Sequence, residues 1–168
     1  MRSTIAVLLS ALLILTGSTP LLAKERTIKI TIIGAGLKPI EISDSKVLAN
    51  FSVWTGPGTS SPGQQGFIID WSQGPVREPA STLRKYRVAF YAGVPPNERI
   101  VYVVYYAFNP STTPGYVYLP GESDELFRRN VHSIFRGVEG KWFRAWDAWE
   151  HVARPLIEKA EHLDSLQS

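Results

Sequence analysis

The sequence contains no cysteine. Without thiols the chain can form no disulfide bond, carry no lipid on a cysteine and use no cysteine nucleophile. Its folded state must therefore be stabilised by an apolar core. A hydrophobic content of 44% makes such a core feasible in a chain of 168 residues.

An excess of charge of one sign is also missing. The chain has 18 lysine and arginine residues against 15 aspartate and glutamate residues, a formal net charge of +3, and no run of basic residues. Nucleic acids and anionic lipid surfaces are bound through concentrated positive charge. The sequence therefore predicts neither as a partner.

Long hydrophobic runs are absent except near the N-terminus. Residues 5–15 are apolar or small, follow a positively charged start, and fall well short of the ~20 residues that span a bilayer. This pattern is typical of a signal peptide. We expect residues 1–23 to be removed, with cleavage after Ser18 as the alternative. The mature chain is then expected to be soluble, secreted or periplasmic, and without a membrane span.

The usual signatures of catalysis and cofactor binding are missing as well. There is no G-x-S-x-G serine motif, and the chain has only three histidines. Gly34 and Gly36 follow a strand pattern, but Pro39 replaces the third glycine of a dinucleotide fingerprint. Gln64 and Gln65 stand where a phosphate-binding loop needs lysine and a hydroxyl residue. We therefore predict no cofactor.

The strongest pattern that the sequence does contain is a strand at residues 99–108. Apolar residues occupy both of its alternating faces, which predicts a central strand covered on both sides. Short turns connect it to strand patterns at 83–91 and 116–119, which favours a three-stranded antiparallel meander. An earlier pair of strand patterns, 26–33 and 37–42, predicts a hairpin.

Shorter elements complete the predicted β-rich part. They are a helix that starts after the capping residues 43–45 and ends near Trp54, a strand at 67–71, a helix at 123–130, and a hairpin that joins 133–136 to 141–145. Glycines bracket the four-residue connection of that hairpin, which is the reason for preferring it to a longer helix.

The C-terminal segment predicts an amphipathic helix over residues 147–164. Its apolar positions, including Trp149, Leu156 and Ile157, follow the 3.6-residue period and need an apolar surface to cover them. Because the period continues across Pro155, we expect a kink or a short break there. The predicted fold is therefore α+β. One domain, residues 24–168, contains a mainly antiparallel sheet or sandwich of seven or eight strands, a short helix in its N-terminal half, and the packed C-terminal helix.

The polar face of this helix places acidic and histidine side chains four residues apart. Asp147 with His151, and Glu158 with His162, have the spacing of paired metal ligands. Arg154 lies between the two pairs and is expected to form an ion pair with Glu158. Each pair would also need ligands from elsewhere in the fold. We therefore interpret this face as solvated and predict no metal site.

Loop carboxylates are the main enzymatic possibility. Two of them can hydrolyse a glycosidic bond if the fold holds them ~5 Å apart in a retaining enzyme or ~6.5 to 9.5 Å apart in an inverting one. The candidates are Asp70, Glu78, Glu122 and Asp124. No pattern in the sequence pairs two of them.

Two tryptophans flank the long loop at residues 55–66, which is rich in glycine, proline, serine and glutamine. A loop of this length is typically functional or mobile. Tryptophan offers a large contact area at a low entropic cost. We therefore predict a ligand- or partner-binding site formed by Trp54, Trp71, Asp70 and Arg77.

The preferred function is accordingly an exported, non-catalytic binding or interaction module. Its partner is an unidentified protein or small molecule. A secreted hydrolase that uses loop carboxylates is the first alternative. A purely structural component of the cell envelope is the second, and it requires Trp54 and Trp71 to be fully buried with no pocket beside them.

Overall fold

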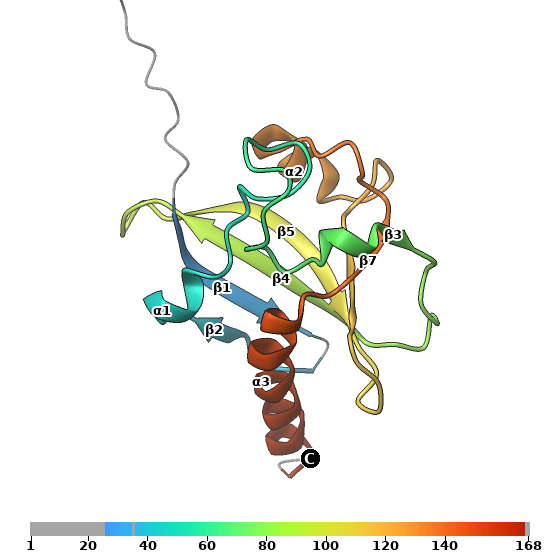
Figure 1. The fold of residues 1–168 in the computed structure, drawn as a ribbon. Helices are drawn as coiled ribbons and strands as arrows, with labels where there is room; N and C mark the ends of the chain where they lie inside the picture. Colours follow the sequence, from blue (N-terminus) through green and yellow to red (C-terminus); the bar gives the residue numbers. More distant parts are fainter. Residues whose placement is uncertain (1–25, 35, 167–168) are drawn as a thin grey trace, which may run out of the picture.

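The computed structural model of the protein describes residues 26–34 and 36–166. The expected signal peptide, residues 1–23, lies outside the described residues. Over those ranges the chain forms an α+β fold in which seven strands build one open antiparallel sheet and three α-helices pack against it (Figure 1). The predicted fold class is confirmed, and the strands form a sheet rather than a sandwich. Within the same ranges, no helix combines the length and the apolar character needed to cross a membrane.

The strands lie side by side in the order β2, β1, β4, β5, β6, β7, β3. Their bounds are β1 (Thr27–Ile33), β2 (Ile40–Ile42), β3 (Pro75–Val76), β4 (Lys85–Ala92), β5 (Arg99–Ala107), β6 (Tyr116–Tyr118) and β7 (Trp142–Arg144). All neighbouring strands are antiparallel. The predicted hairpin is β1 with β2, and the predicted meander is β4, β5 and β6, so both are confirmed.

Strand β5 is central and covered on both faces, as its sequence pattern predicts. On one face Tyr102, Val104 and Tyr106 are completely buried in the main core. On the other face Val103 packs in a smaller cluster with Ala89 and Leu126. A strand with apolar residues on both faces requires this double cover.

The C-terminal helix α3 (Asp147–Ser165) covers the first of these faces and ends one residue later than predicted. Trp149 and Ile157 are fully buried, and Pro155 lies inside one continuous helix. Leu156, however, is 37% exposed, so its predicted place on the buried stripe is wrong. Successive residues of a helix are rotated by about 100°, and Ile157 takes the core-facing position. The last turns of α3 extend beyond the sheet in Figure 1.

The short helix α1 (Ser45–Leu48) starts as predicted but ends well before Trp54. Asp44 is its N-cap, since Asp44 Oδ1 accepts a hydrogen bond from the Lys46 backbone N–H at 2.8 Å. Phe51 is fully buried outside the helix. The chain after α1 therefore continues as an irregular segment packed on the main core.

Residues 67–71 do not form the predicted strand. The first three are fully buried, but only Ile69 makes an isolated β-bridge, to Ala145. The short 3-10 helix η1 (Trp71–Gln73) follows them. A short apolar run indicates burial without specifying a strand. Strand β3 forms instead from two residues after η1, at the sheet edge where proline is tolerated.

The predicted hairpin of residues 133–136 with 141–145 is also wrong. Helix α2 (Phe127–Ser133) starts later than the predicted helix at 123–130 and continues to Ser133, and β7 pairs with β6 and β3. Asn130 anchors this helix on the sheet. Its buried side chain accepts from the Val103 N–H at 2.9 Å and donates to the Val103 carbonyl at 2.6 Å. These bonds satisfy the backbone N–H and carbonyl groups of Val103, because the short strand β6 pairs only with residues 105–107 of β5.

Candidate functional site

A buried arginine fixes the start of the long loop at residues 55–66. Arg136 is 4% exposed, and Tyr102 Oη accepts from its Nε at 3.0 Å. Its other nitrogens donate to three carbonyl oxygens of one short segment, those of Val53 (2.6 Å), Thr55 (2.9 Å) and Pro57 (3.1 Å). Burial lowers the pKa of this guanidinium, and the carbonyl dipoles replace its lost water. The loop therefore starts from a fixed position on the core.

Trp71 belongs to the same packed cluster. Its ring stacks on Phe67 at 6.1 Å, meets Phe143 edge-on at 5.3 Å, and lies 5.3 Å from the Arg136 guanidinium carbon. Gly56 has φ +87° and lies against the indole, where an added Cβ would clash with the ring. The indole Nε1 is buried and has no hydrogen-bond partner among the residues described. Trp71 therefore packs the loop against the sheet.

Asp70 and Arg77, the charged members of the predicted site, lie on either side of η1. Asp70 Oδ1 accepts from the Ser72 backbone N–H at 3.0 Å and from its hydroxyl at 2.6 Å, which caps η1. Arg77 is exposed and directly follows β3. Neither residue, nor Trp71, lines the cavity that Trp54 lines. The structure therefore does not gather the four predicted residues into one cavity.

Trp54 is half-buried and lines a cavity of about 300 Å³, to which β1, the segment after α1 and the long loop all contribute. We refer to it as the Trp54 cavity. The apolar residues Leu48 and Phe51 lie in its wall, and Arg26 is its charged residue. Four lining residues carry hydroxyl groups: Thr27, Ser52, Thr55 and Ser61. An aromatic ring surrounded by hydroxyl groups is suited to a small polar ligand with an apolar face.

The hydroxyl groups of the Trp54 cavity differ in what they already bind. Ser52 Oγ accepts from the Trp54 N–H at 3.2 Å, and Thr55 Oγ1 donates to the Ser52 carbonyl at 2.9 Å. A β-bridge brings Ser61 beside Thr55. Thr27 is only 6% exposed, and its Oγ1 is buried with no partner in the described structure. Because the Thr27 oxygen is shielded from the cavity, the hydroxyl groups of the loop side, such as that of Ser61, are the ones that a ligand can reach.

A second cavity, of about 410 Å³, lies on the sheet face opposite α3. We refer to it as the Tyr118 cleft. Its side chains comprise two aromatic residues and four charged ones: Tyr118, Trp142, Glu78, Asp124, Lys85 and Lys141. The cleft thus brings together two of the four loop carboxylates. Asp124 Oδ2 accepts from Tyr118 Oη at 3.0 Å and from the Gly121 N–H at 2.7 Å, whereas Glu78 is exposed.

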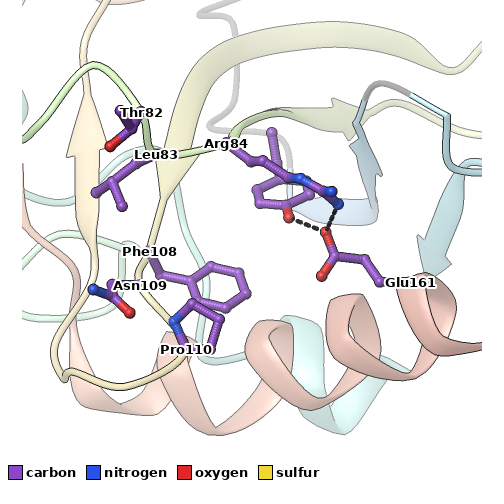
Figure 2. Close-up of a pocket in the computed structure, with 8 residues that line it drawn as sticks. Thr82, Leu83, Arg84, Phe108, Asn109, Pro110 and Glu161 are labelled. Atoms are coloured by element: carbon purple, nitrogen blue, oxygen red, sulfur yellow. Dashed lines mark hydrogen bonds and ion pairs between the residues drawn. The ribbon is translucent and has the colours of Figure 1, made fainter.

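A third cavity, of about 420 Å³, opens between the start of β4, the loop after β5, and α3 (Figure 2). Figure 2 shows Glu161 reaching from α3 towards Arg84. Glu161 Oε1 accepts from Arg84 Nη1 and from Tyr86 Oη, each at 2.6 Å. Burial and this hydrogen bond raise the pKa of the Tyr86 hydroxyl. These polar groups satisfy one another and join α3 to β4, so we assign no ligand to this cavity.

Arg154 of α3 is arranged differently from its prediction. It pairs with Glu150 at 2.5 Å and not with Glu158. Arg154 is 9% exposed. Its guanidinium also donates to the carbonyl oxygens of Asn109 (2.9 Å) and Thr112 (3.0 Å). Arg154 therefore turns into the loop after β5, away from the solvated side of the helix where Glu158 lies.

The histidine and carboxylate pairs of α3 lie on its exposed side. His151 Nδ1 is 2.7 Å from the backbone carbonyl oxygen of Asp147, so this ring nitrogen contacts the backbone. Glu158 and His162 are both exposed. In the part of the chain that the structure describes, no three or more histidine, cysteine, aspartate or glutamate side chains are grouped to hold a metal ion.

Sequence reasoning missed Thr27 and Arg136. The alternation of the first strand assigns Ile28 to the buried face, but a bulge between Thr27 and Lys29 shifts the pattern, and Thr27 is buried instead. Arg136 is the last residue of the predicted strand at 133–136, and no sequence pattern indicates its burial. Comparisons of the chain with protein-family models, with curated proteins and with solved structures found no match in any of the three.

Proposed function

We propose that this protein is an exported, non-catalytic binding module with a small-ligand site in the Trp54 cavity. The proposal rests on one observation above all: Trp54 is half-buried and lines a cavity whose other lining residues include four with hydroxyl groups. A ligand that packs on Trp54 covers the exposed part of its ring, and the hydroxyl residues offer hydrogen-bond partners to its polar groups. Export is proposed from the signal-like pattern of residues 1–23.

The charges around the Trp54 cavity favour a hydroxylated acid as the ligand. Arg26 is the charged residue of the lining, and the lining contains no carboxylate. A guanidinium favours a carboxylate or another planar anion. The four hydroxyl residues match ligand hydroxyl groups, which both donate and accept. Glucuronate combines a carboxylate, hydroxyl groups and an apolar ring face, so it is a suitable probe.

Of the four residues predicted from the sequence, this proposal keeps Trp54 in contact with the ligand. Trp71 and Asp70 would act indirectly, since they pack the loop and cap η1. Arg77 lies outside the cavity lining. A purely structural role is less well supported, because Trp54 is half-buried and has a cavity beside it.

Substitution of Trp54 tests this proposal. We expect glucuronate to bind the purified protein in isothermal titration calorimetry, and Trp54→Ala to raise its Kd by about tenfold or more, as truncation of an aromatic anchor does. Trp54→Phe should retain most of the affinity because it keeps an aromatic face. Ser61→Ala should weaken binding because it removes a hydroxyl group of the lining.

Ser60→Ala is the matched control for Ser61→Ala. Ser60 is the preceding residue of the same loop and is exposed, but it does not line the Trp54 cavity. Its substitution should leave the Kd of glucuronate unchanged. Equal losses in the two alanine variants, or no glucuronate binding by the native protein, would contradict the proposed site.

A hydrolase is the second candidate because Glu78 and Asp124 line one cleft. Asp124 Oδ2 already accepts hydrogen bonds from Tyr118 Oη and from the Gly121 N–H, so it holds its own loop in place. We therefore expect the native protein to release no nitrophenol from a panel of p-nitrophenyl glycosides. Release that is lost in both Glu78→Gln and Asp124→Asn would instead establish the hydrolase.

A further inference from the structure

We propose that the Tyr118 cleft is a second binding site, separate from the Trp54 cavity, and that it takes a neutral saccharide. The inference does not depend on the Trp54 cavity, because the two sites lie on opposite faces of the sheet and share no lining residue. Three observations carry it: the arrangement of the aromatic rings, the charges around the cleft, and the small residue beside Lys85.

The aromatic rings of the cleft belong to one cross-strand row. Tyr105 of β5 lies opposite Tyr118 of β6, and Tyr118 lies opposite Trp142 of β7. The ring centroids are 6.4 Å apart in the first pair and 5.0 Å apart in the second. Trp142 is 6% exposed and packs against Tyr118, so the half-buried Tyr118 gives this wall its accessible ring. An accessible aromatic ring suits the C–H face of a sugar ring, which is apolar.

Lys85 lies over this wall because its cross-strand neighbour is small. Its partner on β5 is Ala107, which leaves the space beside Lys85 open on the same face of the sheet. The Lys85 ammonium consequently lies 5.2 Å from the centre of the Trp142 ring. Lys85 therefore supplies an ammonium group, a hydrogen-bond donor, beside the aromatic rings of the cleft.

The charged groups of the cleft are of both signs and are not matched with one another. Glu78, Lys85 and Lys141 form no ion pair with any residue that the structure describes, although all three line the cleft. An anionic ligand would meet Glu78 and Asp124, and a cationic ligand would meet both lysines. Neutral hydroxyl groups donate to carboxylates and accept from ammonium groups, so they satisfy both signs at once.

The volume of the cleft agrees with this ligand class. About 410 Å³ falls within the range of small-molecule sites. The edge strand β3 contributes Pro75 and Val76 to the lining, which adds apolar surface to the cleft. The cleft therefore combines charged groups with aromatic and apolar surface. A saccharide matches both, because its hydroxyl groups are polar and the faces of its rings are apolar.

The test uses a pool of the neutral disaccharides maltose, cellobiose and lactose. Saturation-transfer NMR with the native protein identifies which of them binds, and calorimetry gives its Kd. Glu78→Gln and Lys85→Gln should each raise that Kd about tenfold, since each removes a charged hydrogen-bond partner. Both residues are exposed, so the variants should fold normally.

Two matched controls complete the experiment. Glu122→Gln removes a nearby exposed loop carboxylate, and Arg87→Gln removes a cation two residues along β4, but neither residue lines the cleft. Both should leave the Kd unchanged. The site would be overturned if no disaccharide bound, if the controls weakened binding as much as the cleft variants, or if Trp54→Ala abolished saccharide binding.

The same spectra separate binding from turnover. Free glucose that accumulates with the native protein but not with Glu78→Gln would support the saccharide site and would overturn the non-catalytic part of the proposed function. Stable disaccharide signals throughout would support both the site and a binding role. Glucuronate binding in the Trp54 cavity is measured independently, so the two proposals can fail separately.

Discussion

Arg136→Met should lower the free energy of unfolding by about 3–5 kcal/mol and remove a large part of the protein's stability. Methionine fills a similar volume but donates no hydrogen bond. The carbonyl oxygens of Val53, Thr55 and Pro57 would lose their donor inside the core, as would the Tyr102 hydroxyl. Each buried group left unsatisfied costs about 1–3 kcal/mol. A domain of this size is stabilised by only about 5–15 kcal/mol in total.

Urea denaturation followed by tryptophan fluorescence measures this change. Arg136→Lys should fall between the native protein and Arg136→Met, because an ammonium keeps the charge but cannot reach four acceptors with the geometry of a guanidinium. Arg87→Met is the control, since Arg87 is exposed on β4 and should tolerate the same substitution. If Arg136→Met unfolded at the same urea concentration as the native protein, Arg136 would not be what holds the loop to the core.

Ile157→Asp should abolish folding, whereas Leu156→Asp should be tolerated. Ile157 is fully buried in the main core against the sheet, and Leu156 is 37% exposed. Burying a carboxylate without a partner costs several kcal/mol, which approaches the whole stability of a small domain. At Leu156 the carboxylate stays in water, so the loss should be about 1 kcal/mol or less.

Circular dichroism during thermal unfolding compares these two neighbouring variants. Ile157→Asp should show no cooperative transition, and Leu156→Asp should melt within a few degrees of the native protein. The pair tests the rotation of α3 about its axis, because a helix turned by one residue would reverse the result. Two equally mild effects would mean that α3 is not docked on the sheet.

The parts of the fold that could be predicted from the sequence are those with a regular period. The double apolar alternation of β5 indicates a central strand, and the 3.6-residue stripe indicates α3. The turns between β4, β5 and β6 contain proline and glycine, which limits those strands to antiparallel neighbours. These patterns depend on residues close together in the chain, so they can be recognised without knowledge of the tertiary structure.

The parts that could not be predicted depend on single long-range contacts. Asn130 anchors α2 by binding the backbone of Val103, and this partner is remote in sequence. The run at residues 67–69 is buried without being a strand, and its composition is the same in either case. Arginine is rarely buried in proteins, so residue type alone predicts an exposed Arg136.

Of the candidate site, residue type alone singles out Trp54, whereas the other features depend on tertiary contacts. Trp54 stands out by its residue type and does line a cavity. Thr27 gives no signal, because a bulge places it on the buried face where a regular strand would place Ile28. The sequence of the long loop indicates no contact with the core, yet Arg136 binds its backbone carbonyl groups. Every residue has such a group, so this contact cannot be predicted from the loop's residue types.

Titration of the ¹⁵N-labelled protein with glucuronate, followed by amide and indole NMR, tests the central claim most directly. The five tryptophans give separate indole signals. Binding in the Trp54 cavity should shift the Trp54 indole signal together with the amides of Thr27, Ser52, Thr55 and Ser61, and should leave the Trp142 indole signal in place. Shifts confined to the Tyr118 cleft, or no shifts at all, would contradict a ligand site at Trp54.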